Sequence, residues 1–249
     1  MESPELQYGQ ANFNLPHDVV QFPSKGVFYK NKKKAAKVGY LTAADENMLM
    51  GSSGNDIIIN LLRSKLYEPD LKPEDLLNGD IEAILIFLRN TSFGPEYVVT
   101  VTDPKTGKKF DTTLILDALE VLKTDVLPDD EGLFSATLPK SDAKVKLRPL
   151  TYRDRNEIDK NAELYPAGRI APVVTWRLQK QIVEVNGERE MGKINDFITS
   201  LLIMDSKFIR TFMSKNEPKL NLSREVICPS GDKITVQINF GSEFFRPFF

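Results

Sequence analysis

The stretch INDFITSLLIMDSKFIRTFM, residues 194–213, carries the strongest structural signal in the chain, because its apolar residues recur three and four positions apart. This spacing predicts a helical stripe that must be buried. Asp205 falls where the stripe should continue, and Asp-Ser is a favourable N-cap pair, so we expect two helices that meet at Asp205. The resulting αα corner must pack either on its own chain or on another protein, and the sequence leaves both alternatives open.

The composition is that of an ordinary globular protein. The chain has 249 residues, 41% hydrophobic and 27% charged, which suffices for one large domain or two small ones. A net charge of −2 gives no general attraction for nucleic acid or for an acidic membrane surface. No apolar run is long enough to span a bilayer and the N-terminus has no signal-peptide pattern, so we expect no stable membrane insertion. The single cysteine, Cys228, excludes an internal disulfide and fits a reducing, intracellular compartment.

The order of helical and β patterns predicts an α+β fold, with a helical N-terminal part, a C-terminal αα corner and β-hairpins. We expect five segments along the chain: an extended N-terminal arm over residues 1–22, a mainly helical part over 23–96, a β-hairpin-rich part over 97–150, a helical part over 151–222, and a β-hairpin with an aromatic tail over 223–249. The sequence leaves open whether these segments share one compact domain.

Capping signals place the expected helix starts. Thr42 and Thr151 are each followed three residues later by an aspartate, which is the pattern of a capping box. Asp80 is expected to cap a helix over residues 81–89, which is apolar nearly all round and therefore central, and Gly94 is expected to end it. Further helices are expected from Asn55 or Asp56, from Pro73 as a first residue, and around Trp176.

Two β-hairpins are expected, at residues 97–116 and 225–238, because β-branched residues there flank turns that contain Pro and Gly. A further β-rich section covers residues 134–148. The lysine-rich run of residues 30–37 is expected to be a solvated hairpin tip, since no aromatic residue is interleaved for stacking on nucleic acid.

No set of residues in the sequence supports covalent catalysis. Residues 187–193 have the spacing of a phosphate-binding P-loop, but Ile194 stands where Ser or Thr must hold magnesium, and two glutamates lie where backbone amides should cradle phosphate. His17 is the only histidine and lies in the expected arm, so neither a catalytic triad nor a His-rich zinc site can be built. Cys228 alone cannot make a four-ligand zinc site, which favours a buried structural thiol. We therefore expect no enzymatic activity, no cofactor and no metal.

The C-terminal residues 239–249, NFGSEFFRPFF, hold five phenylalanines and an arginine. Such side chains are costly to leave in water and are common anchors of protein interfaces. Two alternatives have about even weight: the rings bind a partner, or the tail folds back and packs them into the chain's own core. The candidate partner-binding residues are Phe244, Phe245, Arg246, Phe248 and Phe249 of this tail, with Phe208 and Phe212 of the corner.

Five motifs stand in order along most of the chain: FPSKGVFY at 22–29, YLTAADE at 40–46, NGDI to SFGPEY at 78–97, RPLT at 148–151 and NFGSEFF at 239–245. Together they resemble the baseplate hub assembly family of T4-type contractile-tailed phages. The resemblance implies partners among the phage baseplate hub proteins, no nucleic-acid partner, and action as an assembly chaperone or catalyst in the host cytoplasm. The alternative is a permanent structural subunit of the hub or central spike, and self-association stays open.

Many members of the family that the chain resembles carry Cys-Pro-x-Cys-Gly knuckles at both hairpins. Here the first knuckle reads DPKTG at 103–107 and the second reads CPSG at 228–231. Three of the four thiols are absent, so the zinc that the resemblance implies for the family is not carried over to this chain.

Overall fold

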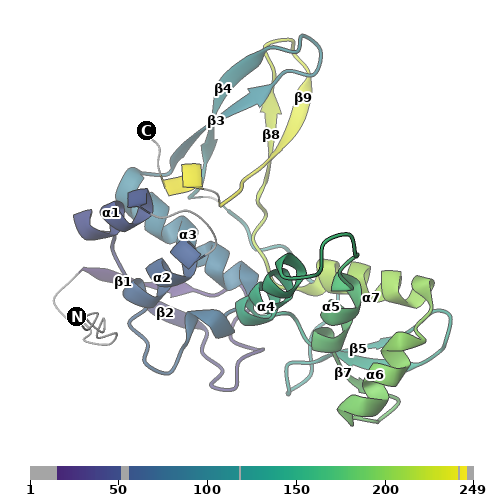
Figure 1. Ribbon diagram of the computed structural model, residues 1–249. Helices are drawn as coiled ribbons and strands as arrows, with labels where there is room; N and C mark the ends of the chain where they lie inside the picture. Colours follow the sequence, from purple (N-terminus) through teal and green to yellow (C-terminus); the bar gives the residue numbers. More distant parts are fainter. Residues whose placement is uncertain (1–15, 52–55, 118, 241, 246–249) are drawn as a thin grey trace.

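The computed structural model describes residues 16–51, 56–117, 119–240 and 242–245. The fold is α+β, as predicted: within these residues, helices α1 to α7 accompany small antiparallel sheets (Figure 1). The buried apolar side chains gather in two clusters, which we call the first core and the second core. In the ranges just given, no helix combines the length and the apolar character needed to cross a lipid bilayer.

The first core is assembled from both ends of the chain. Its buried residues run from Val20 to Leu116 and resume from Leu220 to Phe245. The elements of this part are β1 (His17–Gln21), β2 (Ala35–Gly39), α1 (Ala43–Gly51), α2 (Asp56–Lys65), the 3-10 helix η1 (Pro73–Asp75), α3 (Asn78–Phe93), β3 (Glu96–Thr102), β4 (Lys109–Ile115), β8 (Ser223–Ile227), β9 (Lys233–Gln237) and the 3-10 helix η2 (Ser242–Phe245).

Helix α3 lies at the centre of the first core, as its apolar sequence predicts. Ile84 and Leu88 are fully buried on it. The helix ends where Gly94 takes a φ of +81°, a conformation that a side chain would strain, which confirms the predicted stop.

The expected cap at Asp80 is wrong. Leu77 is the N-cap of α3, and Asp80 lies inside the first turn with no exposure to solvent. Its carboxylate accepts hydrogen bonds from the backbone N–H of Ser24, at 2.9 Å, and from the Tyr29 hydroxyl. Burial raises the pKa of both Asp80 and Tyr29. The carboxylate turns away from its own helix end because the loop after β1 supplies better-placed donors, and it thereby ties that loop to α3.

Strand β1 corrects the expected boundary of the N-terminal arm. His17, expected in the arm, is the first residue of β1, pairs with Gly39 of β2, and packs its ring edge-on against Tyr67 at 5.8 Å between centroids. The ladder hydrogen bonds to β2 fix this segment, and residues 1–15 of the expected arm lie outside the described residues. In the lysine-rich run, residues 30–34 lie in the connection to β2 and Lys30, Lys32 and Lys34 are exposed, as predicted, whereas residues 35–37 belong to β2 and Lys33 pairs with Glu68 and Asp70.

Both predicted hairpins are present, as antiparallel β3 and β4 and antiparallel β8 and β9. They extend side by side from the first core (Figure 1). Their knuckles are joined by the carboxylate of Asp103, which accepts hydrogen bonds from the backbone N–H of Ser230 at 3.2 Å and from its hydroxyl at 3.0 Å. Cys228 is a buried free thiol, and burial raises its pKa.

The second core is formed by the intervening residues. Its sheet has the order β5-β6-β7, all antiparallel, and the helices pack around it. Thr151 caps α4 through the predicted capping box, with both reciprocal hydrogen bonds to Asp154 present. The elements are β5 (Phe134–Thr137), β6 (Lys144–Leu147), α4 (Tyr152–Glu163), α5 (Val173–Gln181), β7 (Ile182–Val185), α6 (Met191–Thr199) and α7 (Ile203–Asn216).

The αα corner forms two helices, α6 and α7, but the expected junction at Asp205 is wrong. The N-cap of α7 is Leu202, and Asp205 is fully buried in the first turn of that helix. Its carboxylate accepts hydrogen bonds from the backbone N–H groups of Lys140, at 2.8 Å, and Ser141, at 3.0 Å. A buried carboxylate is tolerated here because the turn between β5 and β6 supplies two donors.

Candidate functional site

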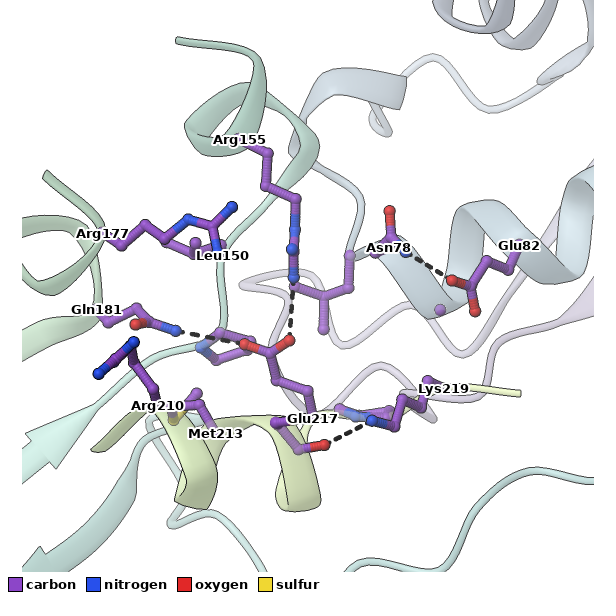
Figure 2. Close-up of a pocket in the computed structure, with 15 residues that line it drawn as sticks. Asn78, Glu82, Leu150, Arg155, Arg177, Gln181, Arg210, Met213, Glu217 and Lys219 are labelled. Carbon is purple, nitrogen blue, oxygen red and sulfur yellow. Dashed lines mark hydrogen bonds and ion pairs between the residues drawn. The ribbon is translucent and has the colours of Figure 1, made fainter. Parts of the chain in front are cut away.

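The junction pocket is a cavity of about 330 Å³ between the two cores. It is lined by the first turns of α3, by α4, α5 and α7, and by residues 217–219, which lead back to the first core. Its charged lining residues are Glu82, Arg155, Arg177, Arg210, Glu217 and Lys219 (Figure 2). Four cationic side chains against two carboxyl groups leave a formal charge of +2 with both carboxyl groups ionised.

The two carboxyl groups of the junction pocket are held in different ways. Glu82 is buried and accepts a hydrogen bond from the Asn78 amide at 2.6 Å through Oε1, while its Oε2 has no hydrogen-bond partner. Burial raises the pKa of Glu82 from 4.5 to about 7. Glu217 pairs with Arg155 at 3.0 Å, and burial raises its pKa despite this cation. Burial in the pocket therefore disfavours the ionised form of both acids relative to a carboxyl group in water.

The arginines of the junction pocket come from three different helices. Arg155 of α4 is half-buried, pairs with Glu217, and keeps a buried Nε without a hydrogen-bond partner. Arg177 of α5 has no hydrogen-bond or ion-pair partner among the described residues, and Arg210 of α7 donates one long hydrogen bond of 3.4 Å to the carbonyl of Ser206. Arg177 and Arg210 are drawn on the same side of the pocket in Figure 2, and both are exposed to solvent.

Gly79 allows the two cores to approach each other at the junction pocket. A Cβ at this position would overlap the carbonyl oxygen of Pro218 and lie 2.8 Å from the Cα of Lys219. The chain leaving α7 therefore crosses directly over the first turn of α3. Any larger residue at position 79 would push these segments apart and alter the pocket.

The structure places Phe244 and Phe245, expected among the partner-binding residues, in the first core. Phe244 has no exposure to solvent, and its ring packs against Tyr97 at 5.4 Å and against Phe240 at 4.8 Å between centroids. Of the two alternatives for the tail, the buried one holds for these two residues. Their assignment to a partner interface is corrected, because the first core already occupies both rings.

A buried arginine explains why the tail turns inward. The guanidinium of Arg89 lies 5.8 Å from the ring centroid of Phe244 and 5.3 Å from that of Tyr97, and it donates hydrogen bonds to the carbonyl oxygens of Gly94 and Glu96. Cation–π contacts of this kind stabilise a cation that is removed from water. The aromatic tail therefore completes the burial of Arg89.

The other expected partner-binding residues have different positions. Phe208 and Phe212 of α7 are half-buried at the edge of the second core, with 5.9 Å between their ring centroids. Each keeps part of its ring accessible, and their role in binding a partner stays a prediction. Arg246, Phe248 and Phe249 lie outside the described residues.

Three consecutive side chains at the start of α7, Leu202, Ile203 and Met204, are exposed, and we call them the corner patch. Ile203 is 83% exposed. The corner lies at the end of the second core away from the hairpins of the first core (Figure 1). Of the two alternatives for the αα corner, its flanks pack on the chain through Ile198 and Ile209, while its tip remains uncovered.

The segment with P-loop spacing has the wrong charges for phosphate. Lys193, which would have to contact phosphate, pairs with Glu188 at 2.7 Å and with Glu190 at 3.2 Å. Both carboxylates occupy the positions where an anion would bind. The described part of the chain also contains no group of three or more His, Cys, Asp or Glu residues arranged to hold a metal ion.

Sequence reasoning missed the junction pocket, because its charged residues are far apart in the chain and share no local pattern. The only signals available were two of the quoted motifs, NGDI at 78–81 and RPLT at 148–151, of which Asn78, Gly79, Pro149 and Leu150 line the cavity. The arginines are separated by helices and a sheet, so only the packing of the two cores brings them together.

Comparison with known families finds one match. A family described as T4 bacteriophage base plate protein matches residues 25–246, which is most of the chain and includes the junction pocket and the corner patch. Comparisons with curated proteins and with solved structures find no match.

Proposed function

Because the chain belongs to the T4 bacteriophage base plate protein family, we propose that it is an assembly factor for the baseplate hub of a contractile phage tail. Within this family the chain, by its five motifs taken together, resembles the T4 baseplate hub assembly protein. The protein binds hub subunits or intermediates in the cytoplasm of the infected host and performs no covalent chemistry. To act repeatedly it must bind the intermediates more tightly than the finished hub.

The corner patch is the observation that carries this proposal. Large apolar side chains that stand adjacent and exposed are typical of surfaces that bind another protein. The patch is presented on a rigid corner, because the buried carboxylate of Asp205 anchors the start of α7 to the turn between β5 and β6. A pre-organised surface loses little entropy when a partner binds.

The absence of covalent chemistry is part of the same proposal. Lys193 is paired with two glutamates, and His17 takes part in strand β1, where its ring packs against Tyr67. The charged groups of the junction pocket suit the binding of an anion, since four cationic side chains line it and the ammonium group of Lys219 already donates a hydrogen bond to the backbone carbonyl of Ser214.

Quantification in virions separates an assembly factor from a permanent subunit. The protein would be measured by mass spectrometry, relative to known tail proteins, in purified virions and in lysates of infected cells. An assembly factor is abundant in the lysate and absent from virions. A fixed copy number in purified virions would instead establish the alternative, a structural subunit of the hub or central spike.

A further inference from the structure

We propose that the junction pocket binds a carboxylate group of a partner polypeptide, presented as an acidic side chain or a chain terminus. The inference rests on the proposed function in one respect, because it assigns the carboxylate to a protein that this chain binds. It adds a second contact, polar and specific, to the apolar contact of the corner patch.

The charge of the pocket is the first argument. Four cationic side chains face two carboxyl groups, and only Glu217 among those acids forms an ion pair with a lining arginine. The guanidinium of Arg177 has no hydrogen-bond or ion-pair partner within the described residues. The guanidinium of Arg210 has only its long hydrogen bond to the backbone carbonyl of Ser206. Cationic side chains that line one cavity without a paired carboxylate repel one another, so an anion bound in that cavity would be stabilised.

The second argument is that guanidinium N–H groups of the pocket arginines lack an acceptor. The buried Nε of Arg155 has no hydrogen-bond partner, although Nη2 of the same guanidinium donates a hydrogen bond to Glu217. Buried donors are rarely left without an acceptor in a functional state. Arg177 and Arg210 lie exposed around the same cavity, so a carboxylate can enter between them without displacing any described ion pair.

The rest of the lining favours a carboxylate of a polypeptide over a nucleic-acid phosphate. None of the lining residues is aromatic, so a nucleotide base has no stacking surface. Leu77, Leu150 and Met213 offer an apolar wall for the methylene groups of an acidic side chain. Glu217, ion-paired with Arg155, also faces the cavity, and its negative charge disfavours a doubly charged phosphate more than a singly charged carboxylate.

In the test, a short oligoglutamate peptide with blocked ends is titrated into the full-length protein. Binding is measured from the changes in the backbone amide NMR shifts of the protein. A matched oligoglutamine peptide and inorganic phosphate are titrated in parallel. The double variant Arg177→Gln/Arg210→Gln should raise the dissociation constant of the peptide by about tenfold or more, because two charge-assisted hydrogen bonds are lost. The control Lys207→Gln/Lys215→Gln removes the same charge from exposed positions outside the pocket and should change it less than about twofold.

Three outcomes would overturn the inference. Wild-type protein that shows no saturable shift with oligoglutamate has no carboxylate site. Equal affinity in the pocket variant and the control variant places any binding elsewhere. Saturable binding of phosphate without binding of the peptide assigns the pocket to phosphate. No hub protein is present in these titrations, so their result is independent of hub binding, and either proposal can fail while the other holds.

Discussion

The aromatic tail and the αα corner are both rich in large apolar side chains, yet the chain buries one and exposes the tip of the other. Phe244 has no exposure to solvent, whereas Ile203 is 83% exposed. The difference follows from a charged residue in each region. Arg89 lies inside the first core and gains from an aromatic ring over its guanidinium, so the tail is drawn inward. Asp205 points into the second core, so the residues just before it turn outward.

The comparison teaches that apolar content alone does not identify an interface. In both regions a buried charge with partners distant in sequence determines which apolar side chains reach solvent. The surface available to a partner is then the corner patch, and the tail residues Phe244 and Phe245 act as part of the fold.

Replacing Phe244 by alanine should give the largest effect, because a fully buried ring in contact with three other aromatic rings is lost. We expect the free energy of unfolding to fall by about 3–5 kcal/mol. Urea denaturation measures it. Phe208→Ala, at a half-buried position, is the control and should cost clearly less. Equal losses at the two positions would contradict the contrast between a buried tail and an accessible edge of α7.

Replacing Asp205 by alanine should have the next largest effect. The backbone N–H groups of Lys140 and Ser141 would lose their acceptor in a partly buried turn. We expect a loss of about 2–4 kcal/mol in the free energy of unfolding, measured by urea denaturation. Asp196→Ala removes an exposed carboxylate from neighbouring helix α6 and should stay within about 0.5 kcal/mol of wild type. An unchanged free energy of unfolding for Asp205→Ala would show that the Asp205 carboxylate does not anchor the corner.

The pH dependence of stability tests the burial of Glu82 in the junction pocket, between the first core and the second core. Because its folded pKa, about 7, lies above the value of 4.5 for the free side chain, the folded state holds the proton more tightly. The free energy of unfolding should therefore fall as pH rises from 4.5 to 7. Above pH 7 the full cost of burying the ionised carboxylate is present. Glu82→Gln should be more stable than wild type above pH 7, by on the order of 1–3 kcal/mol, and should flatten this pH dependence.

Thermal and urea unfolding across pH 4 to 8 would check the Glu82 prediction. Glu46→Gln, at an exposed position of α1, serves as the control and should leave the pH profile unchanged. A Glu82→Gln protein that is less stable than wild type above pH 7 would mean that the carboxylate is stabilised by the cations around it rather than penalised by burial.

Local sequence signals predicted much of the fold. The capping box at Thr151, the stop at Gly94 and the two hairpins depend on residues a few positions apart, and all are present. Asp80 and Asp205 were assigned as caps because their real partners lie 51 to 65 residues away. A short-range pattern cannot distinguish a carboxylate that caps its own helix from one that is satisfied by a distant loop.

The candidate site was less predictable than the fold. The corner was recognised as an apolar surface, but its exposed tip depends on where α7 begins. The N-cap of α7 is Leu202, three positions before Asp205, where the sequence pattern places it. The charged residues of the junction pocket share no local sequence pattern, because its arginines come from three helices. Both features arise from the packing of the two cores.

Changes in the corner patch should have the smallest effect on stability. Ile203→Ser/Met204→Ser alters two exposed side chains and should change the free energy of unfolding by less than about 1 kcal/mol. Leu164→Ser/Ile170→Ser is the control, since these two large apolar residues are also exposed and lie between α4 and α5 or at the end of α4. Thermal unfolding of both variants would establish that any loss of binding reflects the surface and not the fold.

The most direct measurement is the binding of the wild-type protein and these two variants to purified baseplate hub proteins, by calorimetry or by size-exclusion chromatography with light scattering. We expect the wild type and the Leu164/Ile170 variant to bind a hub protein, and the Ile203/Met204 variant to bind it about tenfold or more weakly while remaining folded. Wild-type protein that binds no hub component, or a corner variant that binds as well as wild type, would contradict the account.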